Sequence, residues 1–154
     1  MEVNEAKIKL QKTLAAHRLE VLSNFRETPI VEIKEIPKTR TKFPNTKNDY
    51  WYEMFCKKEN KVKCIYELGP NSIFCTHKHS TSKEFIKILT KKAKVEWVNE
   101  RGIFFKGYND FLEADINEKH ALVNLSNFTI ELEITWHPYM KGWVAEFNQL
   151  KQNG

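Results

Sequence analysis

Most of the chain beyond Pro29 consists of short segments in which hydrophobic and polar residues alternate. In 128–136, for example, Phe, Ile, Leu, Ile and Trp occupy every second position, with Thr or Glu between them. Successive side chains of a strand point to opposite faces, so this pattern predicts strands with one buried and one solvated face. No long helical pattern lies between these segments, which indicates a mainly β fold, an antiparallel sandwich or barrel. The expected strands are 31–36, 50–56, 61–68, 73–78, 84–89, 93–98, 103–106, 120–125 and 128–136.

One long helix is expected before the strands, over 5–25, because this segment lacks Gly and Pro and its hydrophobic residues recur at helical spacing. We therefore divide the chain into an N-terminal helix at 1–27 and a single β-barrel domain at 28–150. The hydrophobic residues form two sectors of the helix surface. The simpler interpretation packs the helix on its own domain; the alternative places one sector there and the other on a second subunit. The sectors are Ala6, Leu10, Leu14, Val21 and Phe25, and Ile8, Ala15, Leu19 and Leu22.

The composition is that of a folded domain, with 41% hydrophobic and 29% charged residues in 154. No segment approaches the roughly 20 apolar residues of a membrane-spanning helix. The start of the chain lacks the apolar stretch of a secretory signal, so we expect a cytoplasmic protein with no membrane partner. The net charge of +5 comes mainly from scattered lysines, and we expect no nucleic-acid partner. The densest basic segment, 34–47, is expected to be an exposed loop, with a polyanion contact as the alternative.

The cysteines and two of the histidines are expected to be structural. Cys56, Cys64 and Cys75 match neither a zinc motif nor a disulfide framework, so we expect thiols. Cys75 is expected to point inward as a small apolar side chain rather than a ligand. His17 lies in the helix pattern and His137 ends a strand.

Four other side chains form a candidate metal site. His77 and His79 lie two apart in an expected strand, so they project to the same side. Such a pair also arises by chance, but a tight turn would bring Glu84 to that side, and His120 begins a further strand. Buried, hydrogen-bonded histidines are the plain alternative, yet an unpaired carboxylate inside a barrel is costly, which favours a metal. Three imidazoles and a carboxylate suit a divalent Fe, Mn, Ni, Cu or Zn ion, with two or three open positions if octahedral.

These residues resemble the two motifs of the cupin family. The first motif is a glycine, a spacer, H-x-H, three or four residues and a glutamate; the second ends in a histidine followed, after three residues, by an asparagine. The resemblance covers about residues 50–136. It implies a small double-stranded β-helix, a jelly-roll barrel, with a divalent metal on the four candidate ligands, although many cupins keep only the fold. A homodimer is also expected, since small cupins are often dimers. The matching residues are Gly69, His77, His79 and Glu84 for the first motif, and His120 and Asn124 for the second.

The chain departs from the family pattern at several turns. The spacer between Gly69 and His77 is long, and no glycine occurs in 89–92. Asn109 replaces the glycine of a Gly-Asp pair, and no proline occurs in 114–119. These departures affect turns and leave all four ligand positions filled.

Alternation predicts which side chains surround the candidate site. A largely apolar, aromatic wall suits a small organic ligand or substrate better than a phosphorylated one, although each aromatic could equally be barrel core. We therefore expect a metal-dependent enzyme, a dioxygenase first and an isomerase or epimerase second, with Glu84 as a ligand or catalytic base. The alternatives are a non-catalytic binding or sensory barrel, and a structural or interaction protein. The expected wall residues are Tyr66, Ile86, Ile88, Trp97, Leu122 and Trp136, with Tyr52 and Phe105 as further candidates.

Overall fold

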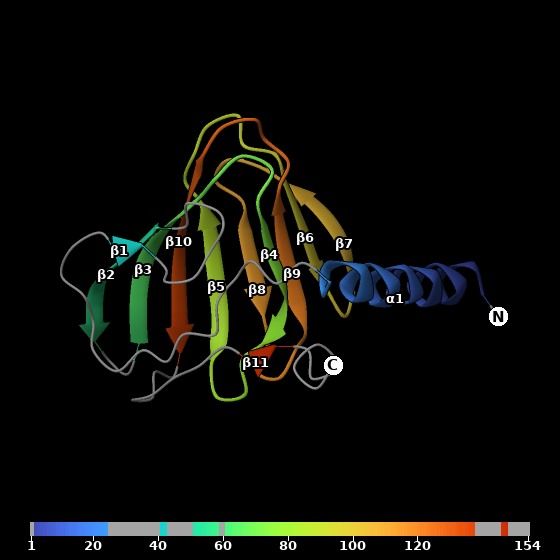
Figure 1. Ribbon diagram of the computed structural model, residues 1–154. Coiled ribbons are helices and arrows are strands. Elements are labelled where there is room, and N and C mark those ends of the chain that lie inside the picture. Colours follow the sequence, from blue (N-terminus) through green and yellow to red (C-terminus); the bar gives the residue numbers. More distant parts are fainter. Residues whose placement is uncertain (1, 25–40, 43–50, 59–60, 138–145, 148–154) are drawn as a thin grey trace.

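Two antiparallel β-sheets face each other, and one helix lies outside them (Figure 1). The structure, a computed structural model, describes residues 2–24, 41–42, 51–58, 61–137 and 146–147. The six-stranded sheet has the order β1 (Thr41–Lys42), β2 (Trp51–Lys58), β3 (Lys61–Leu68), β10 (Ile130–His137), β5 (Lys83–Ile88) and β8 (Phe111–Ala114). The five-stranded sheet has the order β11 (Glu146–Phe147), β4 (Ile73–Lys78), β9 (His120–Asn124), β6 (Val95–Asn99) and β7 (Gly102–Lys106).

The main core lies between the sheets and follows from the alternation in the sequence. In β10, Leu132 is buried while Glu131 is exposed. The register sets Leu132 beside Tyr66 of β3 and Ile88 of β5, so the inward residues of three strands meet. The predicted mainly β barrel with an N-terminal helix is confirmed.

The strand predictions agree closely with the structure. The bounds 61–68 and 73–78 are those observed, and most others shift by one or two residues. Three strands were missed: β1 and β11 have only two residues each, and the four residues of β8 are too few for a clear period. The expected strand 31–36 lies outside the described residues, as does the basic segment apart from 41–42.

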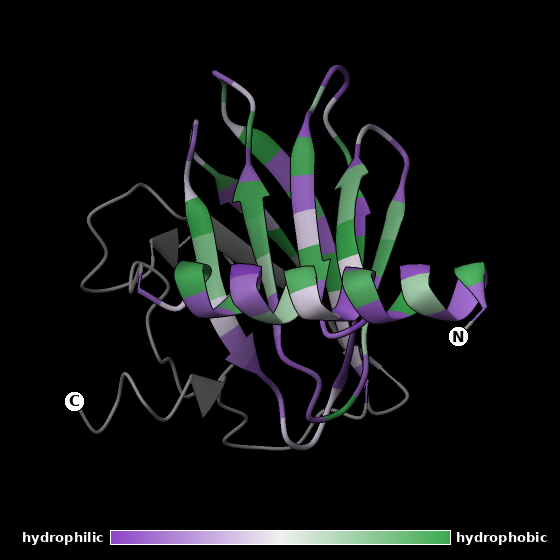
Figure 2. Ribbon diagram, turned by 90° about the vertical axis from the view of Figure 1, so that its right-hand side faces the viewer, coloured by the Kyte–Doolittle hydropathy of each residue, from purple (hydrophilic) through white to green (hydrophobic). Residues whose placement is uncertain are grey.

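The helix α1 (Val3–Leu22) lies across the outer face of the five-stranded sheet (Figure 2). Ala15, Leu19 and Leu22 of the second predicted sector are buried there. They pack against a small second core on the outer face of that sheet. Within the described residues, no helix has the length and hydrophobicity that a membrane crossing requires. The second core comprises Val98, Ala121 and Val123, with Ile73 and Ile103 at its margin.

Polar contacts fix the C-terminal part of the helix in place. Arg18 donates from Nε and Nη2 to the two carboxylate oxygens of Glu96, at 2.7 and 2.8 Å. Thr76 of β4 donates its hydroxyl proton to the carbonyl of Leu19 at 2.5 Å. Because Glu96 and Thr76 are buried, these bonds satisfy groups that would otherwise be costly to bury.

Two of the departures from the family's turn sequences have a conformational explanation. Asn109 has a φ of 70° and Lys92 a φ of 65°, both in the left-handed region where glycine is usual. Asparagine enters this region more readily than most residues, whereas lysine adopts it at some cost. The turns therefore keep the expected backbone shape without the glycines.

Candidate metal centre

The structure brings His77, His79, Glu84 and His120 together between the two sheets. One ligand atom from each lies within 4.8 Å of the others, and all four side chains are buried. His77 on β4 is paired in register with His120 on β9, while His79 follows the end of β4. Glu84 comes from β5 of the opposite sheet, so the donors converge from both walls of the barrel.

A bulge in β4 decides which side chains enter this space. Phe74 pairs with Leu122, but His77 pairs with His120, so β4 has one extra residue between them. Phe74 therefore joins the main core, with its ring 5.5 Å from that of Tyr66, whereas Ile73 packs toward the helix. Strict alternation back from His77 would have placed Ile73 inside. Cys75 lies within the bulge and is buried.

Glu84 links two of the histidines directly. Its Oε2 accepts hydrogen bonds from Nε2 of His79 and Nε2 of His120, both at 2.8 Å. Burial alone would raise the pKa of the Glu84 carboxyl, but His120 and His79 hold that pKa well below its usual value. The site therefore keeps an ionised carboxylate in the interior, which requires cationic partners.

The histidines respond to this environment in opposite directions. Burial lowers the pKa of His120, yet the adjacent Glu84 carboxylate more than compensates and the pKa is raised. Burial, with His120 and His79 nearby, lowers the pKa of His77 well below its usual value. His77 is therefore a neutral imidazole, the form that binds metal ions.

Backbone carbonyls orient two of the rings. Nδ1 of His77 is 2.7 Å from the carbonyl of Cys75, and Nδ1 of His120 is 2.8 Å from that of Glu118. A carbonyl only accepts, so each Nδ1 donates its proton and each Nε2 is directed into the shared space. Such outer contacts are typical of metal-binding histidines. These contacts could not be predicted from the sequence, because every residue type has a backbone carbonyl.

The predicted wall residues are all buried in the main core. Trp97 and Trp136 lie beside the donors, with ring centroids 5.4 Å from His120 and 6.2 Å from His79, respectively. Tyr66 is one ring further away, 6.1 Å from Trp136. The further candidate Phe105 is wrong: β7 is an edge strand and Phe105 pairs with the outward-facing Glu96, so its side chain is 72% exposed. The remaining wall residues are Ile86, Ile88 and Leu122, and the side chain of Tyr52 lies outside the described residues.

Asn124, the last residue of the second motif, holds a turn rather than the donors. Its Nδ2 lies 2.9 Å from the carbonyl oxygens of both Gly69 and Phe128, and its Oδ1 accepts from the backbone N–H of Ser126. Asn124 therefore joins the end of β9 to the loop that precedes β4. His77 lies on β4, and His79 directly follows it.

A hollow of about 460 Å³ lies on the outer face of the six-stranded sheet and is separate from the donors. Lys83 and Phe85 line it and alternate with the inward Glu84 on β5. The sheet itself therefore separates this hollow from the candidate centre. The other lining residues are Lys61, Thr135 and His137.

Comparison with known proteins identifies the architecture. No model of a protein family and no curated protein matches the sequence. A double-stranded β-helix protein from Klebsiella pneumoniae matches with a TM-score of 0.56 at 12% identity, over 67% of this chain and 89% of that one. A predicted oxalate decarboxylase from Thermotoga maritima matches at 0.55 and 20% identity, over 69% and 96%. An RmlC-like cupin from Desulfovibrio desulfuricans matches at 0.50 and 16% identity, over 59% and 84%. The chain has a cupin fold.

The position of the donors within this cupin fold agrees with the two motifs. The first motif supplies β4, the following turn and β5, and the second supplies β9. The described part of the cupin barrel therefore contains a cluster that could hold one metal ion.

Proposed function

We propose that this cupin is a metal-dependent enzyme acting on a small organic molecule, with the ion held by His77, His79, Glu84 and His120. The observation that carries the proposal is the buried Glu84, 4% exposed and within hydrogen-bond distance of two imidazoles. A purely structural core would be more stable with an apolar side chain there. A divalent cation would balance the carboxylate and replace the protons that now join it to the histidines.

The donor set leaves room for chemistry. Three imidazoles and one carboxylate suit Fe, Mn, Ni, Cu or Zn, and an octahedral ion would keep open positions for a substrate. A bound ion of this kind supplies Lewis acidity or, for a redox-active metal, electron transfer. Glu84 either stays a ligand or accepts a proton from the substrate, while Trp97 and Trp136 shield the donors from water.

The reaction classes that we favour are oxygenation, first, and isomerisation or epimerisation, second. Trp97 and Trp136, whose rings lie beside the donors, belong to the buried apolar core, and such surroundings suit an uncharged part of a small substrate. One matched cupin is a predicted oxalate decarboxylase, which supports an enzyme as the broad class. A cupin that only binds a small molecule is the second candidate, because the same donors could capture a ligand without turnover.

Metal content tests the proposal. Protein purified from metal-replete cells should contain close to one transition-metal ion per chain, and the double variant His77→Ala/His79→Ala should contain none. The variant His17→Ala, which changes an exposed histidine of the helix, is the matched control and should retain the metal. Metal-free wild-type protein would overturn the proposal.

A ligand screen by thermal shift, followed by oxygen-consumption and isomerisation assays on each hit, tests the enzymatic part. Turnover that depends on the metal supports an enzyme. Binding without turnover favours the second candidate.

A further inference from the structure

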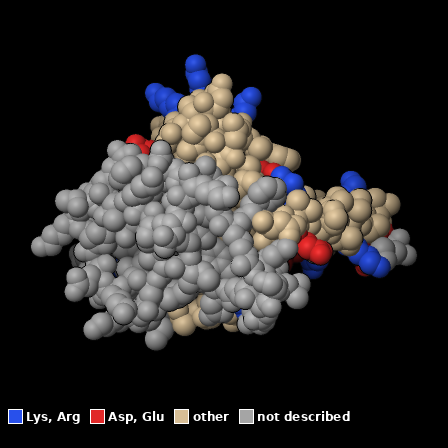
Figure 3. All heavy atoms as spheres, viewed as in Figure 1, with Lys and Arg blue, Asp and Glu red and all other residues tan. Residues whose placement is uncertain are grey.

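The N-terminal half of α1 is not covered by any described part of the chain. Every described residue from 2 to 14 is exposed, whereas Ala15, Leu19 and Leu22 are buried against the barrel. The N-terminal part of the helix projects from the body of the molecule in the space-filling view (Figure 3). Helical segments of about 12 residues are marginal in water without packing, so this half needs a partner surface to be well ordered.

A narrow hydrophobic stripe runs along the helix from the uncovered half into the docked half, and we define it as Val3, Leu10, Leu14 and Val21. At 100° per residue these positions fall within about 40° of one another, about 130° around the helix from the docked residues. Val3, Leu10 and Leu14 are 71%, 58% and 51% exposed, and Val21 is half-buried. The stripe shares Leu10, Leu14 and Val21 with the first sector expected from the sequence. The barrel buries Ala15, Leu19 and Leu22 of the second.

The stripe is symmetric about position 12. Val3 and Val21 lie nine residues on either side of it, and Leu10 and Leu14 lie two residues on either side. In a two-fold dimer, where residue i of one subunit meets residue j of the other, residue j of the first also meets residue i of the second. A stripe whose hydrophobic positions are symmetric about its centre can therefore pair with the same stripe of a second copy. An antiparallel pair centred on position 12 would set Val3 against Val21 and Leu10 against Leu14 from each side.

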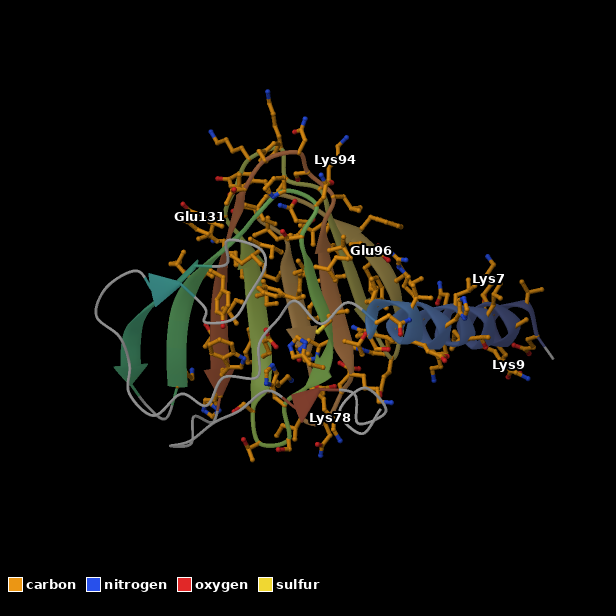
Figure 4. All side chains as sticks on the ribbon, viewed as in Figure 1. Lys7, Lys9, Lys78, Lys94, Glu96 and Glu131 are labelled. Carbon is orange, nitrogen blue, oxygen red and sulfur yellow. The ribbon has the colours of Figure 1, made fainter. Side chains whose placement is uncertain are left out.

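The polar residues near the stripe are compatible with this pairing. Lys7 and His17 also lie equidistant from position 12, so each would face the other residue type rather than its own. Lys7 and Lys9 extend from different sides of the helix, while Glu96 lies by its other end (Figure 4). A long lysine side chain can cover apolar surface and keep its charge in water, and one polar position in a hydrophobic seam helps to fix its register.

The geometry points to a homodimer in which the helices of two copies of this chain pair in antiparallel fashion through the stripe. The Arg18–Glu96 ion pair and the Thr76 hydrogen bond to Leu19 would then transmit the helix position to β6 and β4 of each barrel. This inference does not depend on the proposed metal chemistry.

Sedimentation equilibrium of the full chain tests the dimer. Wild-type protein should have twice the chain mass of 18.3 kDa, and Leu14→Asp should shift the dissociation constant at least tenfold toward monomer. Ile8→Asp is the matched control, because Ile8 is equally exposed at 52% but lies outside the stripe, and its dimer should remain. A monomeric wild type, or equal effects of the two variants, would overturn the inference.

Oxidative cross-linking tests the direction of pairing and does not require a folded Leu14 variant. A mixture of Val3→Cys and Val21→Cys chains should form a disulfide-linked pair, whereas Val3→Cys alone should not, because antiparallel helices place its two copies about 27 Å apart along the axis. Wild-type protein under the same oxidant controls for the natural cysteines. Self-linking of Val3→Cys, or no linking in the mixture, would refute the antiparallel arrangement.

Discussion

Replacing Glu84 by Gln should destabilise the metal-free protein strongly, although the two side chains have nearly the same size. The carboxylate accepts two hydrogen bonds of 2.8 Å from His79 and His120, and its side chain is only 6% exposed. Removing one partner from a buried charged cluster lowers the free energy of unfolding by about 3–5 kcal/mol. Because Gln retains some hydrogen bonding, we expect a loss at the lower end, about 3 kcal/mol. For a domain of this size, that loss lowers the Tm by about 6–12 °C.

The pH dependence of this loss follows from the direction of each pKa shift. The lowered pKa of Glu84 contributes stability that is present above the unfolded carboxyl pKa of about 4.3 and is lost as the pH falls through the folded value. The raised pKa of His120 contributes stability that is present below the unfolded value of about 6.5 and is lost as the pH rises through the folded one. The effect of Glu84→Gln should therefore be largest near pH 6 and smaller near pH 9.

Thermal unfolding of chelator-treated protein, followed by circular dichroism, is the assay. Glu113→Gln is the control, because it makes the same chemical change at a half-exposed carboxylate that pairs with Lys83, and it should cost at most about 1 kcal/mol. An unchanged Tm for Glu84→Gln near pH 6, or an effect that grows with pH, would show that the buried carboxylate is not paired with charged histidines.

Three further predictions concern the helix anchor, the core and the metal. Arg18→Met should lower the free energy of unfolding, measured in urea, by about 1–2 kcal/mol, a modest value because the Arg18 side chain is 36% exposed. Adding Glu96→Leu should recover most of that loss, because it removes the buried carboxylate that Arg18→Met leaves without its partner. No recovery would contradict this explanation of the loss. Leu132→Ala should lower the free energy of unfolding by about 2–5 kcal/mol, whereas Glu131→Ala should change it by no more than about 0.5 kcal/mol. Equal losses would contradict the assignment of the inward face of β10. Bound metal should be retained above about pH 6.5 and released by dialysis near pH 4, because protons compete for the imidazoles and the carboxylate; retention in acid would indicate different ligands.

The sequence was sufficient to predict the barrel and the four clustered side chains for a simple reason. The alternation of hydrophobic and polar residues indicates which face of a strand is buried. Glu84, His77 and His120 all occupy inward positions of their strands. A charged residue at an inward position is rare unless it is paired, so Glu84 was informative by itself.

The features that were not predicted depend on contacts between distant segments. The bulge in β4 arises from its pairing with β9 and turns Phe74, rather than Ile73, toward the main core. Phe105 pairs with Glu96 and therefore lies on the outer face of the edge strand β7, where its side chain is not covered. The helix provides the converse case: both sectors were predicted from the sequence, and the barrel buries Ala15, Leu19 and Leu22 of the second while Leu10 and Leu14 of the first stay exposed.

A crystal structure of the metal-loaded protein, with anomalous scattering collected at the absorption edge of the metal, is the decisive test of a single ion held by His77, His79, Glu84 and His120. We expect one anomalous peak between the two sheets, about 2.0–2.3 Å from a nitrogen of each of His77, His79 and His120 and from an oxygen of Glu84. Crystals grown with excess metal that show no peak there, or that show His120 turned away from the ion, would contradict it.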